Sequence, residues 1–448
     1  MPCAPSAFNH ISSARSAKNG SRRPLVFSLL QGMNRFTPMF AAAFRRCRIV
    51  IVTAFAATCA HAAPSTNSLE VIYADPHALA NAKSAYTAGD AALKPAFDRL
   101  FTEAGKALKS KPASVMDKKR VPPSGDKHDF ISQAPYFWQE TNSPDGKYVR
   151  HDGERNPESS DDFDAGRLGK MCSNVHTLAM AYYFSDKEEY AEHAAQLLRV
   201  WFLDPATRMN PNLNFGQGIP GQVDGRPMGI ISTRAFVGVV DAIRLLRHSK
   251  SWSVADQKGM VAWMTQYLEW LQTNKLGIGE GEATNNHGTF YDTQVAALGA
   301  FVGKTDLAKK IVLDAREKRI AKQIDPDGKM PRELQRTKSF SYSTFNLRAL
   351  MDLANLGQNL GIDLWHFQTE DGRSIRKALD FLAPYVKPDS KWPYQQIEKL
   401  DRRELASLLL RAAPQYPDAH YESLVKDSGI DLAASEDRLL FNTKTAAQ

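Results

Sequence analysis

The stretch "GEATNNHGTFYDTQ" (281–294) marks the start of a buried helix and sets the fold. Asn285 and Asn286 run directly into His287, and apolar and aromatic residues follow at helical spacing. A single asparagine before a helix is ordinary, because its side chain caps the first backbone N–H groups. Capping does not require a second amide followed by an imidazole. We therefore predict a helix over 287–302 whose first turn presents a cluster of uncharged hydrogen-bonding groups.

The same helical pattern recurs along the chain from about residue 76 onward. Apolar residues at intervals of three and four run through 190–203, 235–248 and 259–272. Alternation typical of strands is limited to what a few short strands in loops would need. The chain is therefore predicted to be all-α.

Helical hairpins follow one another at 174–202 and 286–320, and a third begins at 343–367. In each, the first helix is apolar on most sides, as a buried inner helix is, and its partner carries charges on one face. Repeated inner and outer helices build either an open solenoid or a closed (α/α) toroid. Because the hairpins are unequal in length and separated by long loops, the closed toroid is favoured, with the long loops over one end.

The first 62 residues differ from the rest. They contain eight basic residues and no Asp or Glu, and the basic "RRCR" (45–48) leads into an apolar run over 49–60 and then "AHA" (60–62). This order predicts a cleaved signal segment over 1–62, with Met33 as a possible true start. The apolar run is too short to span a membrane. A disordered basic arm is the alternative. We expect a single domain over 63–448 that is periplasmic or secreted, with no membrane span after cleavage.

Charge and cysteine content exclude several classes of function. The chain has 57 basic and 49 acidic residues, and loss of the eight basic residues leaves 49 of each. A neutral mature protein gives no compositional support for nucleic-acid binding. Only Cys172 remains beyond the leader, and it is predicted to be a small buried side chain. His151, His193 and His366 lack the spacing of metal ligands, so we expect no metal and no cofactor.

Two long segments, 126–164 and 204–230, have little helical pattern. Loops of this length within one domain are usually functional. Both are rich in aromatic, amide and arginine side chains, which hold the faces, hydroxyls and carboxylates of sugars. Tyr136 and Trp138 in the first loop are predicted to contact a carbohydrate.

A second polar cluster lies in "MPRELQRTKSFSY" (330–342), just before the next predicted inner helix. It supplies Arg332, Arg336 and Tyr342. In a toroid, the N-terminal ends of successive inner helices open on the same face, so both clusters are predicted to share one cleft. Helix N-termini favour an anionic ligand there.

Amide, imidazole, guanidinium and phenol groups without a metal suit β-elimination in a polysaccharide of uronic acids. The proton at C5 lies next to a carboxylate, whose charge must be neutralised before a base can remove that proton. An acid then protonates the departing glycosidic oxygen. Tyrosine can serve in either role if its pKa falls from about 10, and a nearby arginine acts in that direction.

"NNHGTFYD" and the downstream "RELQRTKSFSY" resemble the alginate-lyase superfamily of polysaccharide lyases, as do the loops at 136–159 and 201–221. The resemblance covers roughly 120–400 and implies an α/α toroid. It implies that Asn286 neutralises the substrate carboxylate, with His287 as its partner or as a base. It further implies that Arg336 binds the acidic sugar and lowers the pKa of Tyr342, which serves as the acid or as both acid and base.

The chain departs from that family's pattern at Gly288-Thr289 and at Ser339-Phe340-Ser341. The substrate therefore stays open between alginate, including polymannuronate, and polyglucuronate. Further substrate contacts are predicted at the following positions: Asn285, Tyr291, Arg332, Arg234, Asn174 and His176. The last two are expected to begin another inner helix, where they either bind substrate or only cap and pack.

Two other functions remain open at this point. A toroidal glycoside hydrolase acting on uronic-acid oligosaccharides would need two carboxylic acids across the cleft, about 5–10 Å apart. The acids available for it are Asp161, Asp162, Asp164, Glu282, Asp292 and Glu333. A carbohydrate-binding protein without catalysis is the second alternative, and Tyr342→Phe distinguishes it, because only an enzyme would lose turnover.

Overall fold

The computed structural model describes residues 70–140, 146–160 and 162–441. The chain divides into two units, Met1–Pro64 and Ser65–Gln448, and every described residue belongs to the second. The predicted leader over 1–62 and its cleavage site lie outside the described residues. Within the described ranges, no helix is both long enough and apolar enough to cross a membrane.

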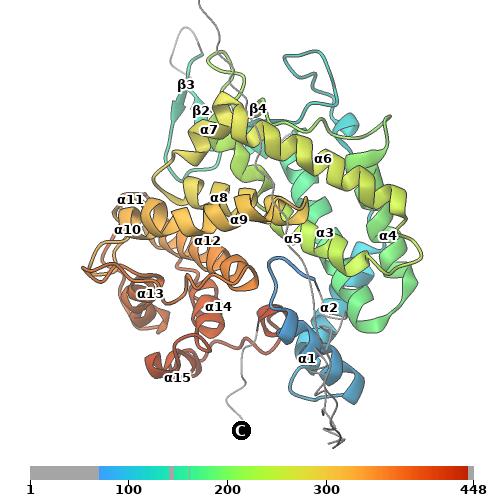
Figure 1. Cartoon of the computed structure of the whole chain (residues 1–448). Helices are drawn as coiled ribbons and strands as arrows, with labels where there is room; N and C mark the ends of the chain where they lie inside the picture. The colour runs from blue at the N-terminus through green and yellow to red at the C-terminus, as the bar shows by residue number, and fades with distance from the viewer. Residues whose placement is uncertain (1–69, 141–145, 161, 442–448) are drawn as a thin grey trace, which may run out of the picture. The chain divides into compact units, whose positions relative to one another are not determined.

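Helices dominate the described part of the chain, with short strands only in the loops (Figure 1). The α-helices are α1 (Pro76–Ala88), α2 (Lys94–Ala107), α3 (Asp164–Ser185), α4 (Glu188–Leu198), α5 (Phe236–Leu246), α6 (Val254–Thr273), α7 (Lys275–Gly281), α8 (Asn286–Phe301), α9 (Thr305–Ala315), α10 (Ala321–Gln323), α11 (Pro331–Leu334), α12 (Ser339–Asn359), α13 (Ile375–Leu382), α14 (Arg402–Ala412), α15 (Tyr421–Asp427) and α16 (Asp437–Leu440). The strands are β1 (Ile131–Gln133), β2 (Phe137–Gln139), β3 (Tyr148–Arg150) and β4 (Phe215–Gly218).

The helices form the predicted inner and outer layers of a toroid. The inner helices α3, α5, α8 and α12 pack side by side in that order, while α4 packs against α3 and α9 against α8. Nearly every residue of α8 is buried, whereas α9 buries only one side. The hairpins predicted at 174–202 and 286–320 are therefore confirmed as α3–α4 and α8–α9.

The ends of the described unit meet and close the ring. α1 packs against α16. The buried carboxylate of Asp241 on α5 accepts hydrogen bonds from the backbone N–H groups of Ile72, Tyr73 and Ala74, at 2.6, 3.1 and 2.7 Å. Asn359 at the end of α12 donates to the carbonyl oxygens of Ile72 and Ala74. The segment 72–74 thus joins two inner helices that are far apart in sequence.

Two inner helices begin earlier than predicted. α3 begins at Asp164 rather than near 174, because the Asp164 carboxylate is buried against Lys118 at 3.1 Å and accepts from the backbone N–H of Ile131. α12 begins at Ser339 rather than 343, because Ser339 donates to the carbonyl oxygen of Gln395 at 2.6 Å. Tertiary partners, which the sequence pattern does not show, extend both helices toward their N-termini.

A buried ion pair fixes the start of α8. Arg319 donates to Asp292 on α8 at 2.7 and 3.0 Å, and also to the carbonyl oxygens of Gly281 and Ala283 just before the helix. A Cβ at position 288 would lie 2.0 Å from the Ala283 oxygen and 2.2 Å from Arg319 Nη1. Only glycine fits there, which explains Gly288 after His287.

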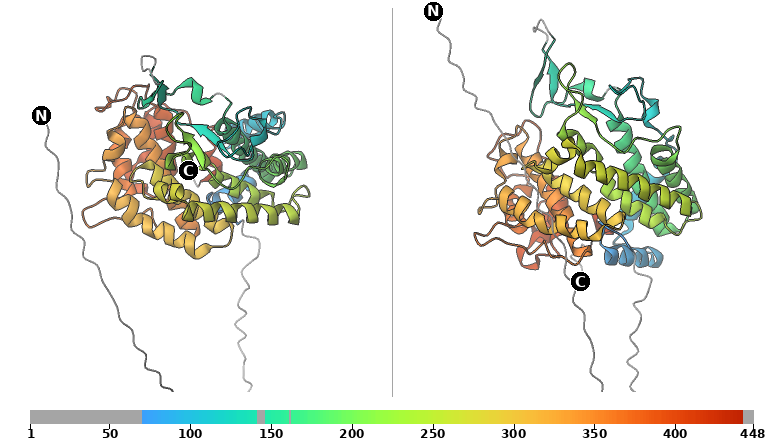
Figure 2. Two further views of the ribbon diagram at one scale, coloured as in Figure 1. Left: turned by 90° about the horizontal axis from the view of Figure 1, so that it is seen from above. Right: turned by 45° about the horizontal axis from the view of Figure 1, so that its top comes forward.

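The two long loops predicted to be functional lie together at one end of the helices, as the views in Figure 2 show. β1 in the first loop pairs in parallel with β4 in the second, and β2 pairs antiparallel with β3. These pairings hold the loops above the N-terminal ends of α8 and α12, where the polar clusters lie.

Candidate active site

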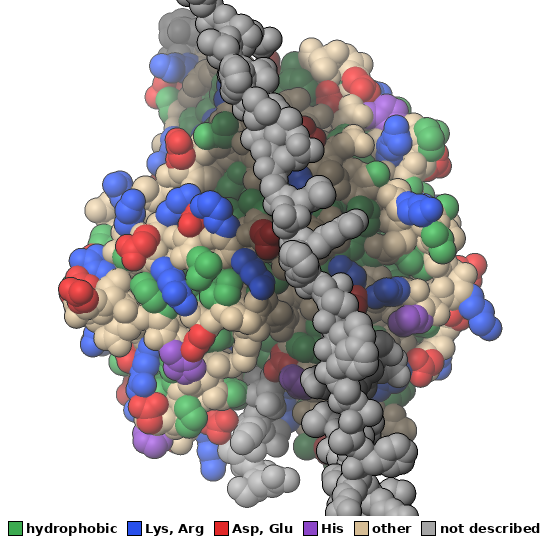
Figure 3. Space-filling view, viewed as in Figure 1, with side chains coloured by type: hydrophobic (Ala, Val, Ile, Leu, Met, Phe, Trp, Pro, Cys, Tyr) green, Lys and Arg blue, Asp and Glu red, His purple; other side chains and the backbone are tan. Residues whose placement is uncertain are grey.

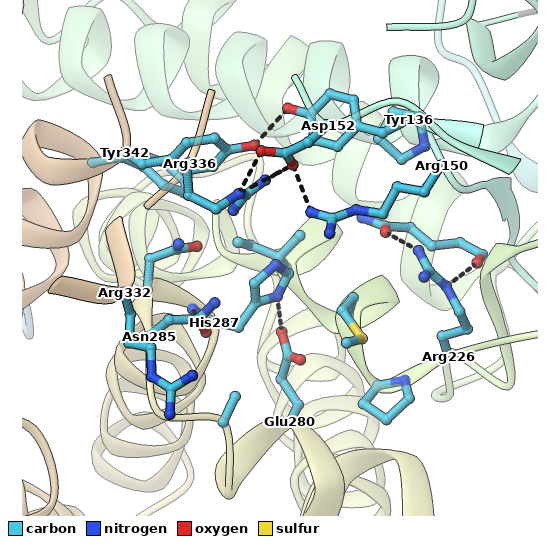
Figure 4. Close-up of a pocket in the computed structure, with 18 of the residues that line it drawn as sticks. Tyr136, Arg150, Asp152, Arg226, Glu280, Asn285, His287, Arg332, Arg336 and Tyr342 are labelled. Atoms are coloured by element: carbon cyan, nitrogen blue, oxygen red, sulfur yellow. Dashed lines mark hydrogen bonds and ion pairs between the residues drawn. The ribbon is translucent and has the colours of Figure 1, made fainter. Parts of the chain in front are cut away.

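One cleft of about 980 Å³ contains both polar clusters (Figure 4). Eight of the predicted residues line it: Asn285, Asn286, His287, Arg332, Arg336, Tyr342, Tyr136 and Arg234. They come from the start of α8, from the segment that ends at the first turn of α12, from the first long loop, and from Arg234 just before α5. The structure therefore brings together groups that the sequence placed in four separate segments.

His287 is oriented by a buried carboxylate. Its Nδ1 lies 2.7 Å from Oε1 of Glu280, which is 1% exposed at the end of α7. Asn285 caps α8 by accepting from the backbone N–H of His287. Because a carboxylate only accepts, Nδ1 is the donor in this contact, and in the neutral tautomer of the ring Nε2 is the nitrogen without a proton. Figure 4 shows His287 between Glu280 and the pair formed by Arg336 and Tyr342.

Asn286 is held by a second buried carboxylate, Glu333 of α11. Glu333 accepts the backbone N–H of Asn286 at 2.7 Å, and Nδ2 of Asn286 lies 3.1 and 2.9 Å from its two oxygens. Both contacts of Nδ2 are therefore with a single carboxylate, while Asn286 itself lines the cleft. Oδ1 of Asn286 has no partner among the described residues. Burial raises the pKa of Glu333, against the lowering effect of Asn286.

Tyr342 and Tyr136 face each other across the cleft. The Tyr342 hydroxyl donates to the Tyr136 hydroxyl at 2.8 Å, and the Arg336 guanidinium lies over the Tyr342 ring at 3.7 Å from its centre. Burial and Tyr136 raise the pKa of Tyr342 above that of an ordinary phenol, although Arg336 acts in the opposite direction. The expectation that Arg336 brings this pKa down is therefore wrong for the net shift. Tyr342 is protonated at neutral pH.

Asp152 joins the first long loop to the segment before α12. It accepts from Arg336 at 2.6 Å, from Arg150 at 2.5 Å and from the backbone N–H of Thr337 at 3.1 Å. Burial alone would raise the pKa of Asp152, but hydrogen bonds from Arg336 and Thr337 hold it at about 2. Gly153 has φ of +80°, and a Cβ there would lie 2.4 Å from Thr337 Oγ1. This close approach requires glycine and sets the position of Arg336.

The cleft carries a surplus of positive charge. Its ionisable lining, apart from His287 and the tyrosines, consists of Arg150, Arg155, Arg226, Arg234, Arg332, Arg336, Asp152 and Glu280. Arg332 and Arg155 are exposed and have no acidic partner among the described residues. On the face drawn in Figure 3, basic and acidic side chains are interspersed where they are visible.

Four predicted substrate contacts lie outside the cleft lining. Tyr291 is 8% exposed and donates to the carbonyl oxygen of Leu271 at 2.9 Å. Trp138 donates to the carbonyl oxygen of Glu154 at 3.0 Å on the outer side of β2. Asn174 and His176 lie in the middle of α3 and not at its start, so the prediction that they begin an inner helix is wrong. Asn174 donates to Ser110, and His176 pairs with Glu436.

In the described structure, four of the acids considered for hydrolysis bind other side chains. Asp162 pairs with Arg167, Asp164 with Lys118, Asp292 with Arg319, and Glu333 accepts from Asn286. Neither these four nor Glu282 lines the cleft. Asp161 lies outside the described residues. The two acids that do line the cleft, Asp152 and Glu280, are bound to arginines and to His287, so a facing pair of free carboxylic acids is not assembled from the described residues.

The positioning groups Glu280 and Asp152 and the arginines at 150, 155 and 226 were missed from the sequence. A signal existed for part of this set, because "YVRHDGER" (148–155) places several charges in a loop already predicted to meet sugars. No signal existed for Glu280, which belongs to a separate short helix. In the described ranges, no group of three or more His, Cys, Asp or Glu side chains is placed to hold a metal. Cys172 is buried, and burial raises the pKa of its thiol to about 12.

Comparisons with known proteins identify the family. The sequence family described as "Alginate lyase" matches residues 114–392, more than half of the chain. An alginate lyase from Bacteroides ovatus, known from its crystal structure, is 42% identical, and the match covers 84% of this chain and 100% of that one with a TM-score of 0.81. A search of curated proteins gave no match.

Distant structures show the same fold. Alginate lyase A1-III from Sphingomonas species A1 is 17% identical, with a TM-score of 0.53 over 85% of this chain and 100% of that one. A variant of A1-III complexed with a tetrasaccharide is 16% identical, with a TM-score of 0.53 over 85% and 98% of the two chains. The predicted helical toroid and the predicted family are confirmed. This chain belongs to the alginate lyase family and is a polysaccharide lyase.

Proposed function

We propose that the substrate is a polysaccharide of uronic acids, either alginate, including polymannuronate, or polyglucuronate. The observation that carries this proposal is the charge of the cleft, where six arginines are balanced by only two acidic side chains. A uronate polymer brings one carboxylate per sugar, and guanidinium groups bind carboxylates in a fixed two-point geometry. A neutral polysaccharide would leave this charge without a partner.

In the proposed reaction His287 is the base. Glu280 keeps the proton on Nδ1, so Nε2 is free to take the C5 proton of the bound uronate. The electron pair of the broken C5–H bond forms the double bond between C4 and C5, and the bond from C4 to the glycosidic oxygen breaks. The imidazolium that forms is stabilised by Glu280, which is buried beside it.

Tyr342 is the proposed acid. It is protonated at neutral pH and can turn its proton from Tyr136 to the departing oxygen. The Tyr136 hydroxyl and Arg336 would then stabilise the tyrosinate that remains. The protonated Tyr342 hydroxyl supports proton donation by this residue in our proposal, with proton abstraction by His287.

Asn286 and a neighbouring arginine are the proposed neutralisers of the substrate carboxylate. The Asn286 amide lines the cleft, and Glu333 fixes the orientation of that amide. Arg332 adds a cation from the segment before α12. Neutralising this charge lowers the barrier to forming a carbanion at C5 and is expected to be a leading catalytic contribution.

The direct test is incubation with polymannuronate, polyguluronate, polyglucuronate and hyaluronan. Elimination leaves an unsaturated sugar that absorbs in the near ultraviolet, and hydrolysis does not. We expect absorbance to rise with at least one of the first three polymers. Release of reducing ends without absorbance would overturn elimination.

Tyr342→Phe tests the acid. The ring and its contact with Arg336 remain, so folding should be retained, while turnover should fall by about 10²–10⁴-fold. Tyr136→Phe is the matched control, because it removes a neighbouring hydroxyl that is not the proposed proton donor and should have the smaller effect. Near-normal turnover of the Tyr342 variant would remove this residue from the mechanism.

We also propose that the protein is exported, with cleavage after Ala62, and acts in the periplasm or outside the cell. The support is the order of basic, apolar and small residues over 45–62. Mass spectrometry of the exported protein should give an N-terminus at Ala63. A mature chain that still contains Arg45 would contradict the proposal.

A further inference from the structure

A second cavity, of about 590 Å³, adjoins the catalytic cleft, and we call it the inner chamber. The two cavities share Pro135, Arg155, Gln217, Ile231, Arg234 and Phe345 as lining. Beyond this junction the inner chamber extends along the first turns of α3 to Gln133 of β1. Its volume lies within the range of about 300–1,000 Å³ that is typical of ligand sites.

Gln133 is an unusual side chain in the wall of the inner chamber. It is 4% exposed, yet neither Nε2 nor Oε1 has a partner among the described residues. Folded proteins rarely leave a buried amide unpaired, because both its donors and its acceptor lose water on burial. An amide that can donate and accept at once fits a pair of neighbouring sugar hydroxyls.

Two exposed glycines of α3 line the inner chamber. Gly166 and Gly169 line it, and a Cβ built at either position would meet nothing within 4 Å. Neither glycine is therefore required by packing or by a left-handed backbone. Both glycines are exposed, so a larger side chain at either position would project into the space beside the first turns of α3.

The floor and the mouth of the inner chamber suit an acidic sugar. The rings of Phe290 and Phe345 lie 4.3 Å apart and give an apolar floor for one face of a pyranose. Arg234 lies over Phe345 at 5.6 Å, and the exposed Arg155 also belongs to both cavities. Two cationic side chains therefore lie where a polysaccharide chain would pass from the cleft into the inner chamber.

We propose that the inner chamber is a subsite for the sugar that follows the cleaved pair along the substrate chain. Gln133 binds the hydroxyls of that sugar, while Arg155 and Arg234 bind a carboxylate at the junction. This inference rests on the proposed uronate substrate and adds a specificity residue, Gln133, that takes no part in the chemical step. It predicts that catalytic efficiency rises sharply at the oligosaccharide length that first fills the inner chamber.

The test is kcat/KM for di- to hexasaccharides of the uronate that the wild-type enzyme cleaves. Gln133→Leu removes the hydrogen-bonding groups at nearly constant size, and Gly169→Leu fills the space. Both variants should match the wild type on oligomers below the step and lose about 10-fold or more above it, mainly through KM. Gly105→Leu is the matched control, since Gly105 is also a helical glycine with open space, on α2 and away from both cavities.

A thermal unfolding measurement separates binding from structure. Because the Gln133 amide has no partner in the described structure, Gln133→Leu should leave Tm unchanged or raise it. Equal losses at all oligomer lengths, or no loss at any, would overturn the inner-chamber subsite while leaving the proposed function intact. A wild-type enzyme that is inactive on every uronate polymer would overturn the proposed function itself.

Discussion

The chain contains two pairs of asparagine and histidine on inner helices, and the two pairs lie in different surroundings. Asn286 and His287 form the first turn of α8 and line the cleft. Asn174 and His176 lie in the middle of α3, where they bind Ser110 and Glu436. Residue types alone made both pairs candidates, but position along the helix separates them.

Each histidine has one carboxylate partner but presents a different nitrogen to it. Glu280 lies against Nδ1 of His287, which leaves Nε2 for the cleft. Glu436 lies against Nε2 of His176, at 2.9 Å, and Nδ1 of His176 faces Gly238 of α5. Nε2 of His176 thus joins α3 to α16 through Glu436. A histidine can act on a substrate only when its partner leaves a nitrogen at an open surface.

The largest difference is expected between the two alanine variants. His287→Ala should lower kcat by about 10²–10⁴-fold, because it removes the proposed base, with little change in Tm. His176→Ala should leave turnover within a few fold and instead destabilise the fold by roughly 1–3 kcal/mol. Steady-state kinetics and thermal unfolding of both variants measure this contrast. Comparable turnover in the two variants would show that position along the helix does not separate these histidines.

Substitution of the two carboxylate partners should show the same contrast in turnover. Glu280→Gln should lower kcat by about 10²-fold, because a glutamine amide can hold the wrong tautomer of His287 and cannot stabilise an imidazolium. Nitrogen NMR shifts of His287 would report the change of tautomer. Glu436→Gln is the control and should leave kcat unchanged. A loss through KM alone in Glu280→Gln would contradict a role in orienting the base.

Each histidine also has a glycine beside it, which gives a sharper comparison. Gly288→Ala would place Cβ 2.0 Å from the Ala283 oxygen, so we expect a loss of about 1–3 kcal/mol in stability together with reduced turnover. Gly238→Ala would place Cβ at 3.4 Å from His176 Nδ1, an ordinary contact, and should be neutral or stabilising by up to about 1 kcal/mol. Unfolding free energies of the two variants decide between these outcomes.

The smallest expected effect is on the pH dependence of stability. Burial acts to lower the pKa of His176 and to raise that of Glu436, but their mutual attraction outweighs burial, so His176 titrates above 6.5 and Glu436 below 4.5. The stabilisation from His176 is complete below its unfolded pKa of 6.5 and is lost as pH rises through the raised value. That from Glu436 is complete above 4.5 and is lost as pH falls through the lowered value.

The ion pair between His176 and Glu436 should therefore stabilise the fold most at pH values between the lowered pKa of Glu436 and the raised pKa of His176. The difference in Tm between the wild type and His176→Gln should be roughly 1–3 °C at about pH 5.5 and should shrink toward about pH 9. Differential scanning calorimetry across this range measures it. A difference that grows with pH would contradict the ion pair.

Several features could be read from the sequence because they depend on local order. The spacing of apolar residues fixes the helices, and the inner helices are recognisable because they are apolar on most sides. "NNH" and the later arginine and tyrosine were predicted to share a cleft, since inner helices of a toroid begin on one face. The two long loops were predicted to contribute to the site, and both do.

Other features were decided only by contacts between distant segments. The sign of the shift in the pKa of Tyr342 depends on burial and on Tyr136, which lies 206 residues away in sequence, and not on Arg336 alone. The starts of α3 and α12 depend on Lys118 and Gln395. The inner chamber exists because β1, α3 and α12 meet. The spacing of apolar residues predicts which side of a helix is buried. The desolvation of a side chain and its hydrogen-bond partners depend on the segments that cover that side, and these come together only when the ring closes.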